Sequence, residues 1–296
     1  MKIFIVVAIY KEEIQNSITV KSIVENNILI GSLFNQVELL IYDNSPAPQK
    51  LEINLSFPII YYSDINNGGL SPAYNYAYKL AKSHYDWILF LDQDTELNKE
   101  YFIELKNAME KININNDAVS IIPKMFHDKT NFSPAQVKWG GIHRPINMKY
   151  SGVYKNGELM AIGSGMVLKT TFISSIGGFN KLFWLDCLDR WVFLSIYRLG
   201  KKCYILPIKL NHQLSILDFS KYMNPKKYLN QIYYEALFML MYKSLAENIF
   251  YLIRIFRRSF YLFYQTKNFG YSKYSLLLIL AIIKSKFNSN KLNNFI

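Results

Sequence analysis

Short apolar runs alternate with longer segments of helical spacing along the first half of the chain. The apolar runs lie at residues 3–10, 37–42, 59–62 and 87–91. Each run has the length of a strand buried on both faces of a sheet. The segments of helical spacing lie between and after them, at residues 12–30, 71–83 and 99–111. Strands that alternate with helices in this way predict a doubly wound, mostly parallel α/β sheet.

The pattern becomes weaker after the apolar residues 119–123. The later segments predict, in order, a loop at 126–160, a strand at 160–168, a helix at 186–199 and a last strand at 203–210. Beyond Lys221 nearly the whole chain is helical in pattern, aromatic and basic. We therefore expect an α/β domain over residues 1–220, followed by a helical extension over residues 221–296.

Two carboxylates follow directly on the most apolar of these runs. In Trp87–Glu96, five apolar residues lead into Asp92-Gln93-Asp94. Open α/β sheets bind their ligands at the carboxyl ends of strands, and residues two apart in an extended segment point the same way. Asp92 and Asp94 can therefore converge on one cation, and two carboxylates with phosphate oxygens suit Mg²⁺ or Mn²⁺. The alternative interpretation is an acidic turn that caps the helix beginning near Asn98.

Two further segments have the composition of a nucleotide site. Asp43 closes the second strand, where a carboxylate can accept hydrogen bonds from a ribose or a base. An Asx-type turn with the following Asn, Ser and Pro is the alternative. The segment Asn66–Gly69 precedes the helix at residues 71–83. Glycines let a backbone approach a phosphate, and a helix N-terminus favours an anion, although an ordinary loop has the same composition.

Composition excludes several classes of protein. A hydrophobic content of 51% is sufficient for a sizeable core and argues against disorder. The only cysteines, Cys187 and Cys203, form no Cys-x-x-Cys pair, which indicates a reducing compartment without a disulfide framework. We see no signal-peptide cleavage site and no apolar run of about 20 residues, the length that spans a membrane. We therefore expect a cytoplasmic protein.

The positive charge is concentrated at the end of the chain. Residues 221–296 contain 12 Lys and Arg against 2 Asp and Glu, a net charge of +10, whereas residues 1–220 contain 22 against 20, a net of +2. Aromatic residues interleaved with these basic ones favour an anionic membrane surface. The alternative is a structural role, in which a packed helical subdomain has a solvated basic rim. No nucleic-acid-binding module accompanies the charge, so we expect a protein peripheral on the inner face of the cell membrane.

Taken in order, several short motifs resemble a known family. They are AIYKEE, IYDNS, NNGGLSPAYNYA, LFLDQD, GSGMVLK, IGGFNKLFWLDCLDRW and the late Asn211-His212. The set resembles the inverting nucleotide-sugar glycosyltransferases of family 2, and among them the rhamnosyltransferase-like branch. The resemblance covers about residues 1–215 and implies a GT-A fold, which is Rossmann-like, with a mostly parallel sheet flanked by helices. The basic C-terminal segment lies outside it.

The resemblance also implies a role for each matching residue. The nucleotide-sugar site would consist of Ala8, Tyr10 and Asp43 at the base and ribose, Asn67 and Gly69 near the diphosphate or sugar, Asp92 at the ribose, and Ser164 in the donor-sugar pocket. The metal site, for Mn²⁺ or Mg²⁺, would consist of Asp92, Asp94 and His212. The catalytic base would be Asp189, with Asp186 as the competing candidate.

The chemistry of a direct displacement agrees with two separate acidic sites. The acceptor hydroxyl must lose a proton as it attacks, and a carboxylate opposite the leaving group can take that proton. The departing nucleoside diphosphate gathers negative charge, which a divalent cation offsets. Helix capping ahead of Arg190–Leu199 is the alternative for Asp186 and Asp189, and a structural histidine is the alternative for His212.

The sequence departs from the family at three positions. An acidic residue commonly lies two positions after the base, where this chain has Trp191, and the usual Pro and Asn of the first strand are Ala8 and Lys11. The resemblance predicts transfer of a sugar, rhamnose from dTDP-rhamnose, onto a lipid-linked glycan in cell-surface polysaccharide synthesis. The alternatives are a UDP-hexose donor, or a non-catalytic partner of another transferase that binds sugar nucleotides, which Trp191 suggests.

Overall fold

Contacts along the chain divide it into two units. The computed structural model describes residues 1–296 except 116, 128–129, 148, 212–223 and 293–296. The first unit comprises Met1–Gln136 and Arg144–Gln213, and the second comprises Val137–His143 and Leu214–Ile296. The expected boundary between residues 220 and 221 lies outside the described residues, so it stays a prediction. The sequence did not indicate that Val137–His143 joins the second unit.

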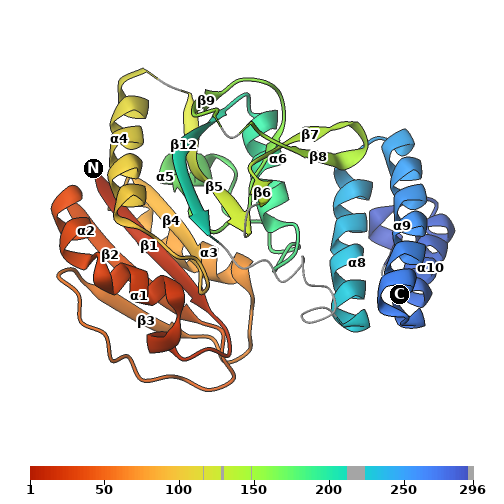
Figure 1. The fold of residues 1–296 in the computed structure, drawn as a ribbon, viewed down its shortest axis with the longest axis horizontal. Helices are drawn as coiled ribbons and strands as arrows, with labels where there is room; N and C mark the ends of the chain where they lie inside the picture. The colour runs from red at the N-terminus through yellow and green to blue at the C-terminus, as the bar shows by residue number, and fades with distance from the viewer. Residues whose placement is uncertain (116, 128–129, 148, 212–223, 293–296) are drawn as a thin grey trace. The chain divides into compact units, whose positions relative to one another are not determined.

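The first unit is built on a large mixed sheet (Figure 1). Its described strands are β1 (Lys2–Ile9), β2 (Gln36–Asp43), β3 (Ile59–Ser63), β4 (Trp87–Asp92), β5 (Ala118–His127), β6 (Thr130–Ser133), β9 (Gly152–Tyr154), β11 (Met166–Lys169) and β12 (Lys202–Asn211). They lie in the order β3-β2-β1-β4-β11-β5-β12-β9, with β6 beside β5. Strands β1 to β4 run parallel, as do β5 and β12, while β6, β9 and β11 are antiparallel to their neighbours. The predicted mostly parallel α/β sheet is confirmed.

Helices cover both faces of this sheet. They are α1 (Ile18–Glu25), α2 (Asn27–Leu33), α3 (Leu70–Ala81), α4 (Lys99–Asn115), α5 (Thr170–Ser175) and α6 (Leu188–Arg198), with a short turn η1 (Ile14–Asn16) before α1. Leu89 and Leu91 of β4 pack into one core with α1, α2 and α4. Phe90 points the opposite way, because side chains alternate along a strand, and its ring lies 4.5 Å from that of Tyr74 on α3. Asp92 has the parity of Phe90, so it belongs to the α3 face.

The prediction of a loop over residues 126–160 was wrong in part. This region contains β6, β9 and the further strands β7 (Ala135–Lys138), β8 (Ile142–Pro145) and β10 (Leu159–Met160), with a turn η2 (Trp139–Gly141). Strands of two to four residues are too short to show an alternating pattern. They form because distant segments pair with them, as β9 pairs with β12 and β10 pairs with β7.

The second unit is helical, with a core of its own. Its described helices are α8 (Pro225–Tyr242), α9 (Leu245–Thr266), α10 (Phe269–Lys284) and α11 (Ser289–Leu292). Tyr228, Tyr251 and Leu278 are buried at the centre of this core. A capping box begins α9: the Ser244 side chain accepts a hydrogen bond from the Glu247 N–H, and the Glu247 side chain accepts one from the Ser244 N–H. Over the described part of the chain, every helix is too short or too polar to cross a membrane.

Candidate functional site

The carboxyl ends of β1, β2 and β4 meet at one edge of the sheet. Ala8 of β1 is in register with Asp92 of β4, and the next residue, Ile9, is in register with Asp43 of β2. The strand order reverses at β1, because the chain goes from β1 to β2 and β3 on one side and to β4 on the other. Ligands of open α/β sheets bind at such a switch point. The structure therefore brings the predicted residues Ala8, Tyr10, Asp43 and Asp92 to one edge.

The turn that begins at Asp92 is held by hydrogen bonds from distant segments. The Ser164 hydroxyl accepts from the Asp92 N–H at 2.9 Å and lies 2.6 Å from the Thr95 hydroxyl. The Thr19 hydroxyl accepts from the Thr95 N–H at 2.8 Å and donates to the Asp92 carbonyl oxygen at 2.5 Å. Ser164 is completely buried, so its hydroxyl positions the turn. Its contact with a donor sugar stays a prediction.

Asp92, Asp94 and Asp189 form a cluster of like charge. Burial, and then repulsion from Asp94 and Asp189, raise the pKa of Asp92 to about 7. Burial and Asp94 also raise the pKa of Glu12. A carboxylate whose pKa is raised by other carboxylates in this way lies close to them without enough positive charge between them. A cation at this place would lower the repulsion.

Asp92 and Asp94 fit the predicted divalent ion. Their donor atoms are oxygens, which both Mg²⁺ and Mn²⁺ prefer, and one or two carboxylates with substrate phosphates commonly bind Mg²⁺. Within the residues that the structure describes, no group of three or more His, Cys, Asp or Glu side chains is arranged as a complete metal site. His212 lies outside the described residues, and its role as a third ligand stays a prediction.

Asp189 lies at the start of α6, after Cys187, whose φ of 64° is left-handed. One carboxylate oxygen accepts a hydrogen bond from the Arg190 N–H at 2.7 Å. Burial is the main cause that raises the pKa of Asp189 to about 6; Asp186 also raises it, and Arg190 opposes this. Asp186 precedes the helix and is half-buried. A perturbed carboxylate that also influences Asp92 is typical of a catalytic site.

Tyr74 of α3 is a site residue that the sequence analysis missed. Its side chain is 2% exposed, and its hydroxyl makes no hydrogen bond within the described part of the chain. Burial, Asp92 and Asp189 together raise the Tyr74 pKa well above its usual value. A buried donor therefore lies near both carboxylates. In the sequence, Tyr74 is one of several aromatic residues on a helix and has the appearance of a core residue.

Asp43 forms the turn that we gave as its alternative interpretation. It is fully buried, and its two carboxylate oxygens accept hydrogen bonds from the Ser45 N–H and the Tyr61 hydroxyl, each at 2.9 Å. Tyr10, at the same edge, is 42% exposed. Both oxygens of Asp43 thus have a partner in the protein, and its contact with a nucleotide stays a prediction, as does that of Tyr10.

The segment with Asn67 and Gly69 packs against the loop that precedes α6. Both residues have a left-handed backbone, with φ of 51° and 84°. A Cβ on Gly69 would lie 2.4 Å from the Trp184 ring, and the Ser71 N–H donates to the Trp184 carbonyl at 3.0 Å. The structure thus joins the glycine segment to the chain that leads to Asp186 and Asp189. Contact of Asn67 and Gly69 with a diphosphate stays a prediction.

Comparison with known families identifies the class of protein. The model of glycosyl transferase family 2 matches residues 4–176, which is more than half of the chain. The chain therefore belongs to glycosyl transferase family 2. A comparison with curated proteins finds no match.

Two solved structures resemble this chain, and the first of them supports the fold assignment. The crystal structure of S. aureus TarS is 17% identical, with a TM-score of 0.50 over 83% of this chain and 41% of that chain. A structure of S. aureus TarS 1-349 is 15% identical, with a TM-score of 0.49 over 100% of this chain and 89% of the other. The chain thus spans about 41% of the length of the first TarS structure. At this identity the likeness concerns the fold, and the predicted GT-A fold is confirmed.

Proposed function

We propose that this protein transfers a sugar from a nucleotide-sugar to a hydroxyl group of a glycan acceptor, with inversion at the transferred carbon. Membership of glycosyl transferase family 2 supports sugar transfer. One observation supports the assignment of roles within the site: Asp92, Asp94 and Asp189 belong to a single electrostatic cluster where the strands end. Asp92 ends β4, Asp94 follows that strand, and Asp189 lies in the first turn of α6. Metal binding and proton transfer can therefore be divided between them.

Asp189 is the proposed base. The acceptor hydroxyl must lose its proton during the displacement, and a base acts best when its pKa is near the working pH. With a pKa of about 6, Asp189 is largely ionised at neutral pH and is a stronger base than an ordinary aspartate. Asp186 is the competing candidate, since it lies three positions earlier in the same segment, just before α6.

Asp92 and Asp94 are the proposed ligands of Mn²⁺ or Mg²⁺. When bound, the ion would offset the charge that develops on the leaving nucleoside diphosphate. The chain's own contribution is the turn held by Ser164 and Thr19, which keeps both carboxylates in place before the donor binds. Tyr74 adds a buried hydroxyl that can donate to a bound oxygen near the two acidic sites.

The donor and acceptor follow from the family resemblance. We propose dTDP-rhamnose as the first donor to test, UDP-hexoses as the second, and a lipid-linked glycan of a cell-surface polysaccharide as the acceptor. The charge of +10 over residues 221–296 supports binding of the second unit to the anionic inner face of the cell membrane. The second candidate function is a non-catalytic subunit that binds sugar nucleotides, which the replacement of an acidic residue by Trp191 favours.

The variant Asp189→Asn tests the proposed function. It keeps the size of the side chain and removes the base, so we expect nearly normal donor binding and turnover reduced by about 10²-fold or more. Turnover is measured as nucleoside diphosphate released from a panel of dTDP- and UDP-sugars in the presence of Mn²⁺.

Asp186→Asn is the matched control, with the same chemical change three positions earlier, before α6 begins. Loss of turnover in that variant, with Asp189→Asn active, would transfer the role of base to Asp186. A wild-type protein that binds a donor and never releases the diphosphate, with or without acceptors, would be the non-catalytic subunit.

A further inference from the structure

The second unit contains a pocket that the proposed transferase site does not use. Its volume is about 670 Å³, and it lies between α9 and the segment Gly141–His143 of the same unit. Its polar lining consists of His143, Glu235, Arg254, Arg257 and Arg258. Phe250, Ile253 and Tyr261 supply apolar wall. The pocket is therefore both basic and apolar.

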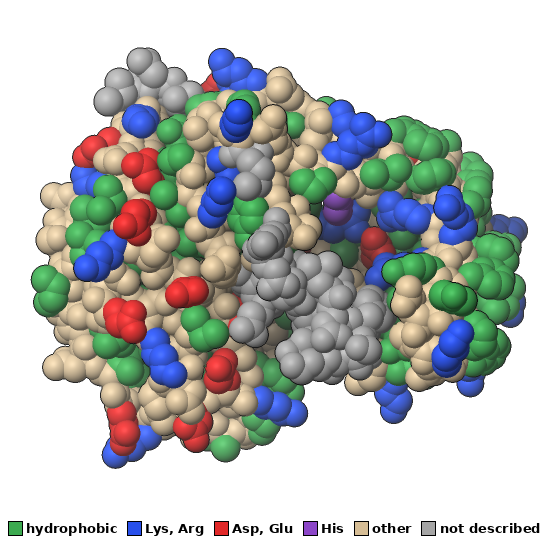
Figure 2. Space-filling model, viewed as in Figure 1, with side chains coloured by type: hydrophobic (Ala, Val, Ile, Leu, Met, Phe, Trp, Pro, Cys, Tyr) green, Lys and Arg blue, Asp and Glu red, His purple; other side chains and the backbone are tan. Residues whose placement is uncertain are grey.

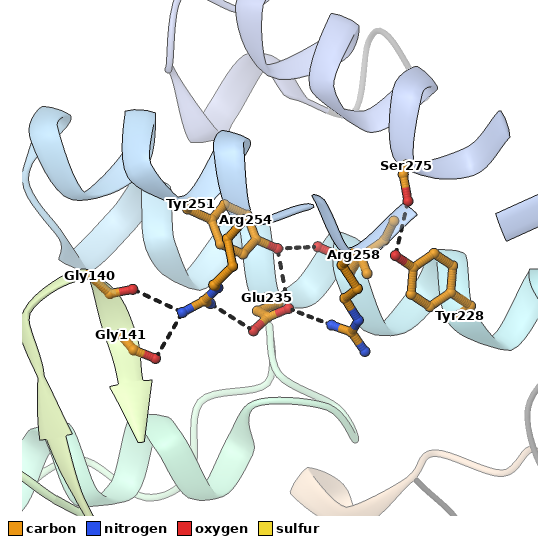
Figure 3. A network of polar contacts seen from close by, with 9 residues as sticks. Gly140, Gly141, Tyr228, Glu235, Tyr251, Arg254, Arg258 and Ser275 are labelled. Atoms are coloured by element: carbon orange, nitrogen blue, oxygen red, sulfur yellow. Dashed lines mark hydrogen bonds and ion pairs between the residues drawn. The ribbon is translucent and has the colours of Figure 1, made fainter. Parts of the chain in front are cut away.

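The wall of this pocket is fastened to α9. One Arg254 nitrogen donates to the carbonyl oxygens of Gly140 and Gly141 at 3.0 and 3.1 Å, as Figure 3 shows. Gly140 packs so closely on Phe250 that a Cβ would lie 2.5 Å from its ring. The Gly140 N–H also donates to Glu247 at 3.3 Å. These contacts fix the turn before His143, so the pocket has a defined wall.

The charges in the pocket favour an anion. Glu235 lies 3.4 Å from Arg254 and 3.5 Å from Arg258 (Figure 3), so one carboxylate is shared by two guanidinium groups. Arg257 also lines the pocket and has no hydrogen bond or ion pair within the described residues. Three arginines against one glutamate leave a net charge of +2 without counting His143. The planar fork of arginine suits phosphate oxygens.

Helix α9 has a third face next to the core face and the pocket face. The core face includes Tyr251, Ile255 and Leu262. The third face is a row at helical spacing, 43% to 60% exposed: Ile249, Ile253, Phe256, Phe260 and Phe263. Figure 2 shows basic and apolar side chains side by side over the visible surface of this helical unit. Ile253 belongs both to this row and to the pocket lining, so the apolar row borders the pocket.

We propose that the pocket binds the phosphate of an anionic membrane lipid, whose hydrocarbon chain lies along this exposed row of α9. A phosphate attached to an apolar chain is the one ligand that uses both features, since a free phosphate would leave five large apolar side chains in water. The inference deepens the proposed membrane association, because it assigns a specific site to it. It does not depend on sugar transfer, and each test below measures binding.

The first test compares two single charge removals in the full-length protein. The probe is a phosphatidylcholine vesicle that contains phosphatidylglycerol, and binding is measured by sedimentation. We expect Arg257→Gln to weaken binding by about tenfold or more, the scale of a lost charge-assisted hydrogen bond. The matched control is Lys273→Gln, which removes one exposed charge from α10 outside the pocket. It should cost about fivefold or less, the effect of one charge near an anionic surface.

Equal losses of binding in Arg257→Gln and Lys273→Gln would mean diffuse electrostatic attraction and would overturn the proposed site. Absence of wild-type binding to these vesicles would overturn it as well.

The second test is Phe260→Ser, which changes the most exposed phenylalanine of the row. We expect it to weaken vesicle binding by about tenfold at high salt, where the apolar contribution dominates. Unchanged binding of Phe260→Ser, together with release of the protein from vesicles by inorganic phosphate at constant ionic strength, would identify a free-phosphate site instead.

Discussion

At the scale of single residues, the ionisation of Asp92 destabilises the folded protein when no cation is bound. Its pKa is raised from 3.8 to about 7, so the folded state binds this proton more tightly than the unfolded chain does. Below about pH 4 both states are protonated and the group contributes nothing. The destabilisation grows as the pH rises from there, and is complete above about pH 7.

We therefore expect Asp92→Asn to raise the Tm of the metal-free protein at about pH 8 and to leave it unchanged near pH 4. The gain in free energy of unfolding is on the order of a few kcal/mol, since one pKa unit is about 1.4 kcal/mol. Asp117→Asn is the control, because Asp117 is exposed and its ion pairs at 3.8 Å lie on the surface. In thermal scans, added Mn²⁺ should raise the Tm of the wild-type protein and should leave the Tm of Asp92→Asn unchanged. An equal Tm for wild type and variant at both pH values would contradict the charge cluster.

Some site residues could be predicted from the sequence, and others could not. Asp92 and Asp94 were found because an apolar run leads directly into them, which is a local pattern. Thr19 and Tyr74 have no local signal of this kind, and Ser164 was named only through the family resemblance. Ser164 acts on the backbone of Asp92 across 72 positions of sequence, and such a contact exists only once β4 and β11 pair.

At the scale of elements, the loop before α6 is built against Gly69. The sequence predicted this glycine as a place where a phosphate could approach, which stays a prediction. The structure shows that a Cβ at this position would meet Trp184. The Asn-Ser-Pro sequence after Asp43 correctly suggested a turn, because the residues that favour a turn are adjacent in the sequence. The short strands between residues 130 and 160 were missed because their stability comes from distant pairing partners.

Gly69→Ala should destabilise the first unit more than a glycine replacement whose only penalty is the strain of a positive φ. At Gly69, φ is +84° and a Cβ would meet the Trp184 ring at 2.4 Å and its carbonyl oxygen at 2.5 Å. Gly177 is a matched control, since its φ is +73° and nothing lies within 4 Å of its Cβ position. We expect Gly69→Ala to exceed Gly177→Ala by about 1–3 kcal/mol in urea unfolding, the usual cost of overpacking. Equal losses of unfolding free energy in the two variants would mean that the loop containing Trp184 moves aside without a cost in stability.

At the scale of the whole molecule, each of the two units has a hydrophobic core of its own among the described residues. The large core of the first unit includes Leu89 and Leu105, and the core of the second includes Tyr251 and Leu278. The predicted α/β sheet and helical C-terminal segment followed from periodicity over long stretches. The membership of Val137–His143 in the second unit could not be predicted, because it depends on contacts such as that of Arg254 with Gly140 across 114 positions.

Separate cores predict that the two units unfold in separate steps. Leu278 and Leu105 are each completely buried, one in each core. Leu278→Ala and Leu105→Ala remove the same atoms, and each should cost about 2–5 kcal/mol within its own unit. We expect calorimetry to resolve two transitions. Leu105→Ala should lower the Tm of the first unit's transition, and Leu278→Ala should lower the Tm of the second unit's transition. A bound nucleotide-sugar with Mn²⁺ should raise only the transition that Leu105→Ala lowers, because a ligand stabilises the unit that binds it. A single transition that both variants lower equally would mean that the two cores unfold as one cooperative unit.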